Sequence, residues 1–334
     1  MANFTIDHLK SGGLITNYFC TSRCRHCLYN AGPHREKKYI DPGIAEADLR
    51  VVRDLGCYRV HIGGGEPLLR PDALGEVLDV AARLGVSIDY VETNSSWFKD
   101  PDSAEKTLAR LRRHGLRALL VSISPFHNEF IPFSRVEGVI EAARQVGVEI
   151  FPWISDFIFD LSQFDPGKSH KLEAYLQKFG QDYLLKVLQR YWVHLGGRAL
   201  DTFRPFFETK PFDQIIQESS ESCRVELSDT SHFHIDLFGN YIPGLCSGFA
   251  ILRDDLGQPL TPEKYPLLTT LFHSGIRELA QMARKEFAYK PAKARYINKC
   301  DVCTEIRTFL VRNSYNKSSE LHPAEFYLNY YKGL

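Results

Sequence analysis

Short apolar runs alternate with amphipathic segments along the first half of the chain. Each apolar run is bounded by glycine or by small polar residues, which is the pattern of a buried strand. The runs cover residues 14–19, 58–62, 86–91, 119–123 and 148–154. From the second run onward they start about every 30 residues, the length of one βα unit. The pattern therefore predicts an α/β fold built on a parallel sheet.

Helix signals occupy the gaps between these runs. Asp41 precedes a proline at the first helical position, a combination that caps and starts a helix. Ser134 and Glu137 have the spacing of a capping box at the start of another helix. Gly85 and Gly147 follow amphipathic runs and predict where two helices end. Helices are thus expected between successive strands.

The regular alternation changes in the middle of the chain. Residues 168–195 carry apolar and aromatic side chains at helical spacing, which is the pattern of a helix packed on a core. Gly180 is expected to split or bend that helix. A sixth strand is predicted at residues 199–203, after two glycines.

The two parts of the chain are predicted to be different domains. Six strands with intervening helices predict a partial TIM-like (β/α)6 barrel over residues 1–205. Beyond this point the βα rhythm is lost, and residues 206–334 are expected to form a small domain of their own. Within it, residues 232–243 have the pattern of a β-hairpin that turns at residues 238–240.

Composition and charge narrow the functional classes. The chain has 334 residues, of which 44% are hydrophobic, so it can bury an ordinary core. Lysine plus arginine and aspartate plus glutamate both number 41, so no overall positive field attracts nucleic acid or an anionic membrane. The chain does not open with a basic segment followed by a long apolar one, and no later run has the length of a membrane span. The cytoplasm is the expected location.

Three cysteines lie within eight residues directly after the first predicted strand. Cys20, Cys24 and Cys27 form a C-x3-C-x2-C array. Such close spacing favours metal ligation over disulfides, and cubane iron-sulfur clusters are held by cysteine runs of this kind. Three ligands leave one iron of a four-iron cluster open to bind a substrate or cofactor. A structural zinc site completed by His26 or another histidine is the alternative.

Polar and glycine-rich segments follow the next three predicted strands. Residues 63–67 have the sequence Gly-Gly-Gly-Glu-Pro, and residues 92–94 are Glu-Thr-Asn. Ser122, Ser124 and His127 lie at the end of the fourth strand. Loops after the carboxyl ends of barrel strands converge on one face, so we expect these groups to meet the cysteine loop. His127 is a candidate acid or base near neutral pH.

A second set of cysteines lies in the second half of the chain. Cys223 and Cys246 flank the predicted hairpin, and Cys300 and Cys303 form a C-x2-C pair. Four thiolates can ligate one iron-sulfur cluster completely, and a tetrahedral zinc site is the alternative. The remaining cysteine, Cys57, precedes the second strand and is expected to be a buried structural thiol.

These motifs resemble those of the radical S-adenosylmethionine (SAM) enzymes. The resemblance rests on the C-x3-C-x2-C array and on a Gly-Gly-Glu turn about 35 residues later. It implies a [4Fe-4S] cluster on the three cysteines, with its open iron bound to SAM. It also implies that SAM is contacted by residues from the turn and the strand ends. These residues are Gly64, Gly65, Glu66, Asn94, Ser122 and Ser124.

The second half resembles a SPASM or shortened SPASM-like domain, which implies one auxiliary [4Fe-4S] cluster on Cys223, Cys246, Cys300 and Cys303. Among subfamilies the sequence is most similar to epipeptide epimerases, which modify ribosomally made peptides. That similarity includes the Ser-Ile-Ser stretch of the fourth strand and a tyrosine-rich tail at residues 327–331.

The sequence departs from those epimerases at one position. The resemblance implies a spare cysteine beside the auxiliary-cluster ligand, where it returns a hydrogen atom to the peptide radical. Here Cys246 is flanked by Leu245 and Ser247. Net oxidation or cross-linking is therefore easier to support than epimerisation.

The resemblance implies reductive cleavage of SAM to a 5′-deoxyadenosyl radical, which abstracts a hydrogen atom from a substrate. A peptide is the first expected substrate and a small biosynthetic intermediate the second. A flavodoxin- or ferredoxin-type protein is the expected electron donor. A zinc-stabilised binding protein and an electron-transfer iron-sulfur protein are the alternatives that involve no SAM chemistry. No catalytic side chain is assigned from the sequence.

Overall fold

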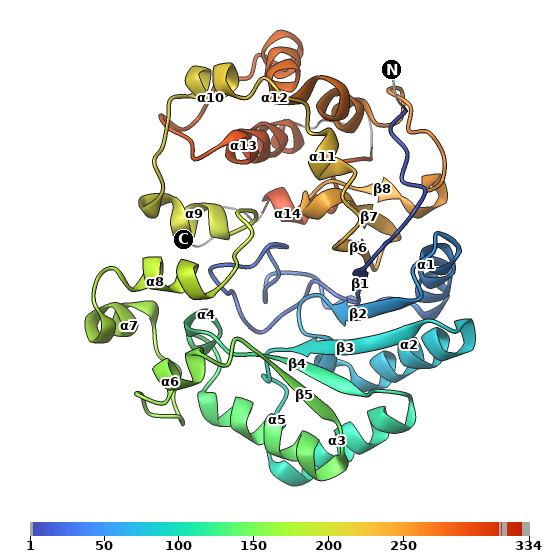
Figure 1. Ribbon diagram of the computed structural model, residues 1–334, viewed down its shortest axis with the longest axis vertical. Helices are drawn as coiled ribbons and strands as arrows, with labels where there is room; N and C mark the ends of the chain where they lie inside the picture. The colour runs from blue at the N-terminus through green and yellow to red at the C-terminus, as the bar shows by residue number, and fades with distance from the viewer. Residues whose placement is uncertain (1–2, 314, 316–318, 329–334) are drawn as a thin grey trace.

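The computed structural model describes residues 3–313, 315 and 319–328. Eight strands form one sheet in the order β5-β4-β3-β2-β1-β6-β7-β8 (Figure 1). The first five, all parallel, are β1 (Gly12–Ile15), β2 (Arg59–Gly63), β3 (Ser87–Thr93), β4 (Ala118–Ser122) and β5 (Glu149–Trp153). The others are β6 (Phe233–Asp236), β7 (Asn240–Ile242) and β8 (Ile251–Leu252). The predicted α/β class, an open barrel-like sheet, is confirmed.

A long helix lies between each pair of successive strands from β1 to β5. These helices are α1 (Pro42–Asp54), α2 (Pro71–Leu84), α3 (Pro101–Arg113) and α5 (Phe133–Val146). They pack beside one another along the outer side of the sheet (Figure 1). The short helix α4 (Pro125–Asn128) follows β4 directly. Loops, rather than the long helices, therefore surround the carboxyl ends of the strands.

Local sequence signals set most of these helix ends. The Asp41 carboxylate accepts a hydrogen bond from the Gly43 backbone N–H at 2.8 Å, as expected of an N-cap. Gly85 and Gly147 end α2 and α5 with φ angles of 70° and 69°, a left-handed conformation that glycine adopts without a steric penalty.

The predicted capping box of Ser134 and Glu137 is wrong. Helix α5 begins one residue earlier, at Phe133, and Pro132 at its N-cap has no side chain that can accept a hydrogen bond. The Ser134 backbone N–H instead donates to the Pro166 carbonyl at 2.8 Å. A contact from a distant loop thus replaces the local cap.

The middle of the chain is helical. It contains α6 (Phe157–Leu161), α7 (Leu172–Phe179), α8 (Tyr183–Arg190) and α9 (Ala199–Phe203). Gly180 ends α7 with a φ angle of 101°, which confirms the predicted interruption. The predicted sixth strand at residues 199–203 is wrong, because that segment is α9, with Ala199, Leu200 and Phe203 buried.

Strand β6 extends the sheet beside β1, at the opposite end of the parallel strands from β5. It runs parallel to β1, with Gly12 opposite Phe233 and Ile15 opposite Asp236. The predicted hairpin is confirmed, since β7 pairs antiparallel with β6. The sheet thus continues across residue 205, and the division into domains at that point stays a prediction.

The remaining helices cover the far end of the sheet. They are α10 (Phe212–Glu218), α11 (Arg224–Leu227), α12 (Pro266–Phe287), α13 (Lys299–Arg312) and α14 (Glu325–Leu328). Short 3-10 turns lie at Pro67–Leu69, Arg204–Phe206, Pro243–Leu245 and Arg253–Asp255. In the tyrosine-rich tail, Tyr327 is buried, whereas Tyr330 and Tyr331 lie outside the described residues.

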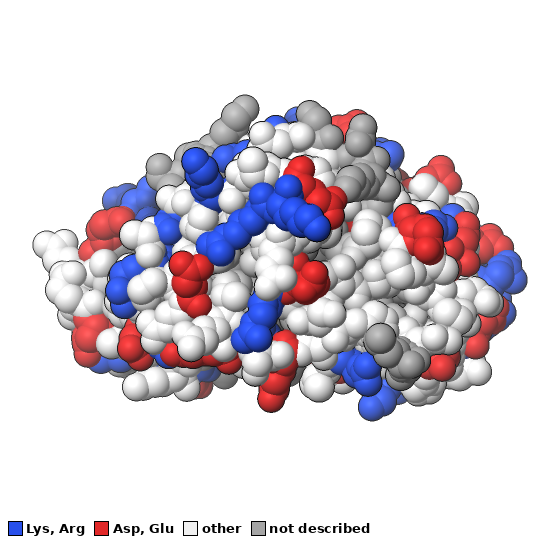
Figure 2. Space-filling model, turned by 90° about the horizontal axis from the view of Figure 1, so that it is seen from above, with Lys and Arg blue, Asp and Glu red and all other residues white. Residues whose placement is uncertain are grey.

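Acidic and basic side chains are mixed on the surface. On the face seen in Figure 2, lysine and arginine lie beside aspartate and glutamate rather than forming a field of one sign. Among the described residues, no helix combines the length and the apolarity that crossing a membrane requires.

Candidate functional site

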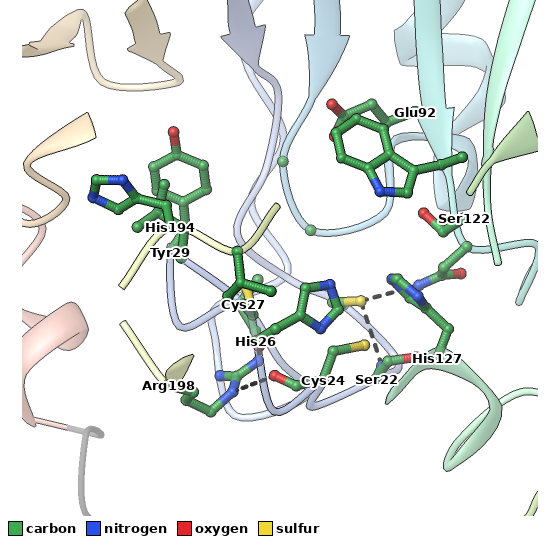
Figure 3. Close-up of a pocket in the computed structure, with 18 of the residues that line it drawn as sticks. Ser22, Cys24, His26, Cys27, Tyr29, Glu92, Ser122, His127, His194 and Arg198 are labelled. Carbon is green, nitrogen blue, oxygen red and sulfur yellow. Dashed lines mark hydrogen bonds between the residues drawn. The ribbon is translucent and has the colours of Figure 1, made fainter. Parts of the chain in front are cut away.

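A cavity of about 220 Å³ lies at the carboxyl ends of the central parallel strands. It is lined by all three cysteines of the first array, Cys20, Cys24 and Cys27. Residues from the ends of three further strands share the lining: Gly64, Gly65, Asn94 and Ser122. Figure 3 shows the cysteine loop facing Glu92, Ser122 and His127 across this space. The expected convergence of the loops is therefore present.

The cysteine loop is closed at its base by backbone hydrogen bonds. The Cys20 N–H donates to the Gly32 carbonyl and the Gly32 N–H donates to the Tyr18 carbonyl, both at 3.3 Å. Inside the loop, the Cys27 N–H donates to the Cys24 carbonyl at 3.1 Å. Within this compact turn all three cysteines line the same cavity, as one metal centre requires.

The surroundings of the sulfurs fit metal ligation. Burial raises the pKa of Cys20 to about 12, and that of Cys24 well above its ordinary value, so both are protonated thiols without a metal. The Asn94 amide donates to the Cys20 sulfur at 3.2 Å, and the Ser22 backbone N–H does so at 3.4 Å. Donors aimed at a buried sulfur stabilise the thiolate that a metal creates.

The glycine turn packs tightly against the start of the cysteine loop. Gly64 has a φ of 137°, and a Cβ there would lie 2.5 Å from the Asn17 carbonyl oxygen. A Cβ on Gly65 would lie 2.0 Å from the Phe19 carbonyl oxygen. Only glycine fits at either position, so the turn and the loop form one rigid unit.

The Glu66 side chain points into the protein rather than into the cavity. Its carboxylate accepts hydrogen bonds from the Asn94 and Leu68 backbone N–H groups and from the Thr93 hydroxyl, at 2.6, 3.1 and 3.0 Å. Burial raises its pKa to about 7. Glu66 therefore connects the glycine turn to the end of β3 and holds Asn94 beside the cysteines.

Ser124 also lies behind the cavity wall. Its hydroxyl is 2.7 Å from Nδ1 of His127, which does line the cavity. Burial lowers the pKa of His127 to about 4, so its imidazole is neutral at neutral pH. His127 can therefore exchange hydrogen bonds with a ligand, but it does not titrate near neutral pH as the sequence suggested.

Arg198 is a site residue that the sequence analysis missed. Its guanidinium donates to the Cys24 and Ala31 carbonyls, both at 2.8 Å, and its backbone N–H donates to the Cys27 carbonyl at 3.1 Å. Figure 3 shows the bond to Cys24. No local motif marks this arginine, because the segment before α9 reaches the loop only through the tertiary fold.

Other lining residues that were missed for a similar reason are Tyr29, Trp153, Tyr191, Trp192 and His194. Glu92 also lines the first cavity, as expected for the Glu-Thr-Asn segment. Glu92 stands next to Thr93 and Asn94, and its position at a strand end was the available signal. Burial raises its pKa to about 7. Trp192 is 68% exposed, so the cavity mouth presents an aromatic surface.

The second set of cysteines lines a separate cavity of about 80 Å³. Cys223 precedes α11, Cys246 follows a 3-10 turn, and Cys300 and Cys303 lie in the first turn of α13. The structure thus brings together four thiols that are up to 80 residues apart. Burial raises the pKa of Cys223 to about 12, and the neighbouring Cys303 and Cys300 contribute to this rise.

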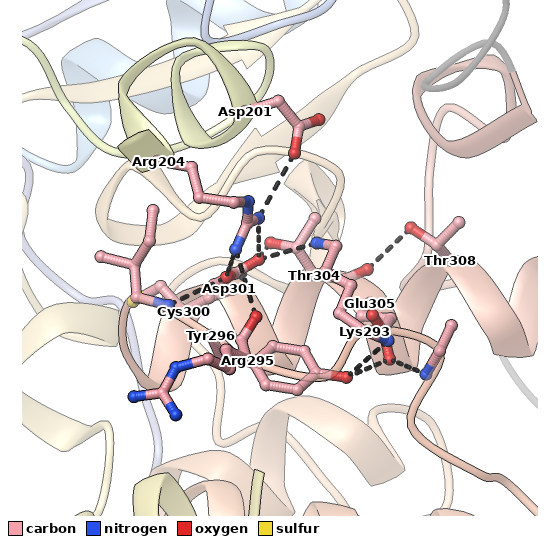
Figure 4. Close-up of polar contacts among 12 residues, drawn as sticks. Asp201, Arg204, Lys293, Arg295, Tyr296, Cys300, Asp301, Thr304, Glu305 and Thr308 are labelled. Atoms are coloured by element: carbon pink, nitrogen blue, oxygen red, sulfur yellow. Dashed lines mark hydrogen bonds and ion pairs between the residues drawn. The ribbon is translucent and has the colours of Figure 1, made fainter. Parts of the chain in front are cut away.

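Asp301 anchors the helix that carries two of these cysteines (Figure 4). Its fully buried carboxylate accepts hydrogen bonds from Arg204 at 2.6 and 2.9 Å and from Lys293 at 2.9 Å. Burial alone would raise the pKa of Asp301, but the Arg204 hydrogen bond and the Lys293 charge outweigh it and lower the pKa. Asn298 caps the helix by accepting from the Cys300 and Asp301 N–H groups.

One segment connects the two cavities. His194 lines both, and Gly196 and Gly197 line the second. A Cβ on Gly197 would lie 2.4 Å from the carbonyl oxygens of Cys27 and Leu28. The cysteine loop therefore touches the wall of the second cavity through this segment.

In a comparison with protein families, residues 14–159 match the model described as "Radical SAM superfamily". Curated relatives include the GTP 3′,8-cyclase of Aquifex aeolicus, 28% identical over 166 residues, or 43% of this chain and 49% of the relative. The GTP 3′,8-cyclase of a Sulfurovum species is 25% identical over 226 residues, or 58% of this chain and 65% of the relative. The chain thus spans about half the length of these relatives.

Solved structures with a similar fold include SuiB of Streptococcus suis bound to S-adenosylmethionine. It shares 18% identity, with a TM-score of 0.41 over 82% of this chain and 69% of that chain. Another is anSMEcpe with bound AdoMet, at 14% identity and a TM-score of 0.42 over 91% of this chain and 98% of that one.

Proposed function

We propose that this chain is a radical SAM enzyme that removes a hydrogen atom from its substrate. The observation that carries the proposal is the meeting, in one cavity, of Cys20, Cys24 and Cys27 with the glycine turn and the polar ends of β3 and β4. These three cysteines would hold a [4Fe-4S] cluster, whose reduced form would supply the electron for cleaving SAM to methionine and a 5′-deoxyadenosyl radical. The match of residues 14–159 to the Radical SAM model supports the same conclusion.

The residues around the cavity have distinct roles in this proposal. The exposed backbone of Gly64 and Gly65, with Asn94 and Ser122, contacts SAM. Glu66 and Ser124 act from behind the wall, where they hold the Asn94 backbone and the His127 ring. Such preorganised polar groups orient a cofactor at little cost in conformational entropy.

We further propose that Cys223, Cys246, Cys300 and Cys303 hold an auxiliary [4Fe-4S] cluster. The common cavity of these four thiols supports this assignment. In the proposal, residues 1–205 hold the SAM site and residues 206–334 form a SPASM-like domain. A flavodoxin- or ferredoxin-type protein supplies electrons from outside.

The reaction that this arrangement favours is an oxidation, such as a cross-link. Seven of the eight cysteines line the two cavities, and the eighth, Cys57, is buried before β2 with its sulfur donating to the Arg59 carbonyl. Among the described residues that line the first cavity, none carries a spare thiol that could return a hydrogen atom, which disfavours epimerisation. The auxiliary cluster would accept the electron left on the substrate.

A ribosomally made peptide is the proposed substrate. The sequence resemblance to peptide-modifying radical SAM enzymes supports it, and so does the exposed Trp192 at the cavity mouth, which can pack against a peptide side chain. A small biosynthetic molecule is the second candidate. The relatives named as GTP 3′,8-cyclases favour it, since their names specify a nucleotide substrate.

SAM cleavage in the anaerobically reconstituted, reduced protein tests the enzyme class. We expect 5′-deoxyadenosine to form, and the triple variant Cys20→Ala, Cys24→Ala, Cys27→Ala to form none while keeping the absorbance of the second cluster. About eight irons per chain support two cubanes. Two zincs and a colourless protein would contradict the proposal, and iron without SAM cleavage would indicate an electron-transfer protein.

Mass spectrometry distinguishes between the two candidate substrates and between oxidation and epimerisation. Candidate peptides encoded beside the gene, and GTP, are incubated in turn with SAM and reductant. A loss of two mass units from a peptide supports oxidation. Deuterium uptake from heavy water without that loss indicates epimerisation instead. Consumption of GTP with no peptide modified would favour the small-molecule candidate.

A further inference from the structure

Two histidines meet across the first strand of the sheet. Gly13 on β1 pairs in parallel register with His61 on β2 and with His234 on β6. A Cβ on Gly13 would lie 2.3 Å from the Nε2 atom of His61. The missing side chain therefore leaves space above β1, and the Nε2 atoms of His61 and His234 come within 3.1 Å of each other there.

A third histidine completes the cluster. His232 lies two residues before His234, and alternate residues of a strand point to the same side of the sheet. The ring centroid of His232 is 4.9 Å from that of His234 and 5.4 Å from that of His61. One ligand nitrogen from each of the three rings lies within 4.8 Å of the others. His61 and His234 are buried, and His232 is exposed.

We propose that His61, His232 and His234 bind one divalent transition-metal ion, separate from both cysteine sites. Metal–nitrogen bonds of ~2.0–2.1 Å place two nitrogens about 3.0 Å apart at a right angle and about 3.3 Å apart at a tetrahedral angle. The 3.1 Å separation of the His61 and His234 nitrogens lies within this range. An N–H···N hydrogen bond between the two rings has the same length, so it is the third ring, His232, that points to a metal ion.

The outer contacts of the cluster support ligation. The Tyr29 hydroxyl lies 2.7 Å from Nδ1 of His234, which leaves Nε2 to face the other two rings. A hydrogen bond on the far nitrogen fixes the tautomer and orientation of most metal-binding histidines. His61 is likewise hydrogen-bonded to the backbone of Gly12. Burial lowers the pKa of all three histidines, so they are neutral and have lone pairs to donate.

The donor set and its surroundings indicate what the site would bind. Imidazole ligands suit zinc, iron, copper and nickel, and three protein ligands leave a coordination position for a further molecule. Glu92, whose Oε1 is 3.8 Å from Nε2 of His61, and Tyr29 both line the first cavity. The ion would therefore lie beside that cavity, where an oxygen or nitrogen of a small molecule could take the fourth position. This inference does not depend on the SAM chemistry.

Zinc is the probe for the test, because X-ray absorption at the zinc edge is unaffected by cluster iron. The full chain with both clusters loaded receives one equivalent of Zn²⁺ and is desalted. We expect about one zinc per chain, with a first shell of nitrogen and oxygen at ~2.0–2.1 Å, imidazole scattering, and no sulfur at ~2.3 Å. A sulfur shell, or no retained zinc, would overturn the proposal.

Three variants make the assignment specific. The double variant His61→Gln, His234→Gln should retain no zinc, and His232→Ala should weaken zinc binding about tenfold or more. His232 is exposed, so its replacement leaves the core intact. Loss of zinc from His232→Ala therefore cannot be attributed to misfolding. His114→Gln is the control, since His114 is paired with Asp79 on the outer helices. Equal zinc retention in the control and in the His232 and double variants would also overturn the proposal.

Discussion

At the scale of single residues, burial and hydrogen bonding decide what each side chain can do. The resemblance to the Gly-Gly-Glu turn of radical SAM enzymes predicted Glu66 as a cofactor contact, but its carboxylate is fully buried and bonded to the end of β3. The same resemblance predicted Asn94, whose side chain lies against the Cys20 sulfur. Sequence position thus identified the right loops, whereas the direction of each side chain came from packing.

The hydrogen bond from Asn94 to Cys20 should tune the reduction potential of the proposed SAM-binding cluster. Asn94→Leu removes one donor to a ligating sulfur, and the reduced cluster, being more negative, loses more stabilisation than the oxidised one. We expect its reduction potential to fall by about 40 mV, the equivalent of ~1 kcal/mol for one electron. A redox titration followed by electron paramagnetic resonance measures the change. The auxiliary cluster is the internal control, and equal shifts in both clusters would contradict the assignment.

At the scale of elements, segments distant in sequence hold the two cysteine sites in place. Residues 194–203 brace the first loop through Arg198, through Gly197 and through the Thr202 hydroxyl, which donates to the Arg25 carbonyl at 2.8 Å. Helix α13 carries the second pair of cysteines and is fixed by Asp301. Each site therefore depends on an element outside its own motif.

The close approach at Gly197 can be tested with one methyl group. In Gly197→Ala the new Cβ would lie 2.4 Å from two backbone carbonyl oxygens of the cysteine loop, so the loop must move. We expect less iron in the first cluster and a several-fold loss of SAM cleavage. Gly85→Ala is the matched control, because Gly85 also has a positive φ, 70°, but a Cβ there meets nothing within 4 Å. Iron analysis and the cleavage assay compare the two.

Any effect common to both glycine variants reflects the unfavourable φ angle alone, which costs about 1 kcal/mol. Equal activity in Gly197→Ala and Gly85→Ala would therefore contradict the bracing role of residues 194–203.

Loss of the buried Asp301 charge should destabilise the second site. Asp301→Asn leaves Arg204 and Lys293 without their shared buried carboxylate. Breaking a buried ion pair of this kind lowers the free energy of unfolding by about 3 kcal/mol. We expect a lower urea midpoint and loss of auxiliary-cluster absorbance. Asp213→Asn is the control, since Asp213 pairs with Arg284 at the surface and its side chain is 82% exposed. An exposed ion pair contributes at most about 1 kcal/mol to the free energy of unfolding. Similar urea midpoints for the two variants would therefore contradict the anchoring role of Asp301.

At the scale of the whole molecule, many titratable groups are buried beside one another. Burial lowers the pKa of histidines in both halves of the chain, including His26, His127, His194 and His234. These rings are neutral in the folded protein near neutral pH. Unfolding returns them to water, where a histidine has a pKa of about 6.5.

The protein should therefore lose stability on mild acidification. Because the folded pKa values are depressed, the stabilisation is complete above about pH 6.5 and decreases as the pH falls toward 4, the value for His127. For His127 alone the loss at pH 5.5 is about 1 kcal/mol. Urea unfolding at pH 7.5 and 5.5 measures the effect, and His127→Gln should reduce the difference. The exposed His8→Gln is the control, and a midpoint that rises on acidification would refute the expectation.

The sequence alone determined features that depend on near neighbours in the chain. The order of strands and helices up to β5, the helix starts and ends at Asp41, Gly85 and Gly180, and the β6-β7 hairpin follow from hydrophobic periodicity and local hydrogen bonding. The three cysteines of the first loop belong to this class, since a single turn brings them together.

Only the tertiary structure decided which distant segments meet. The apolar residues 199–203 are too few to distinguish a strand from a helix, and in the structure they form a helix that packs against the cysteine loop, while β6 pairs with β1. The same pairing of β6 with β1 placed His234 opposite His61 across Gly13. Such contacts depend on strand order and register, which join residues far apart in the chain and leave no periodic signal in the sequence.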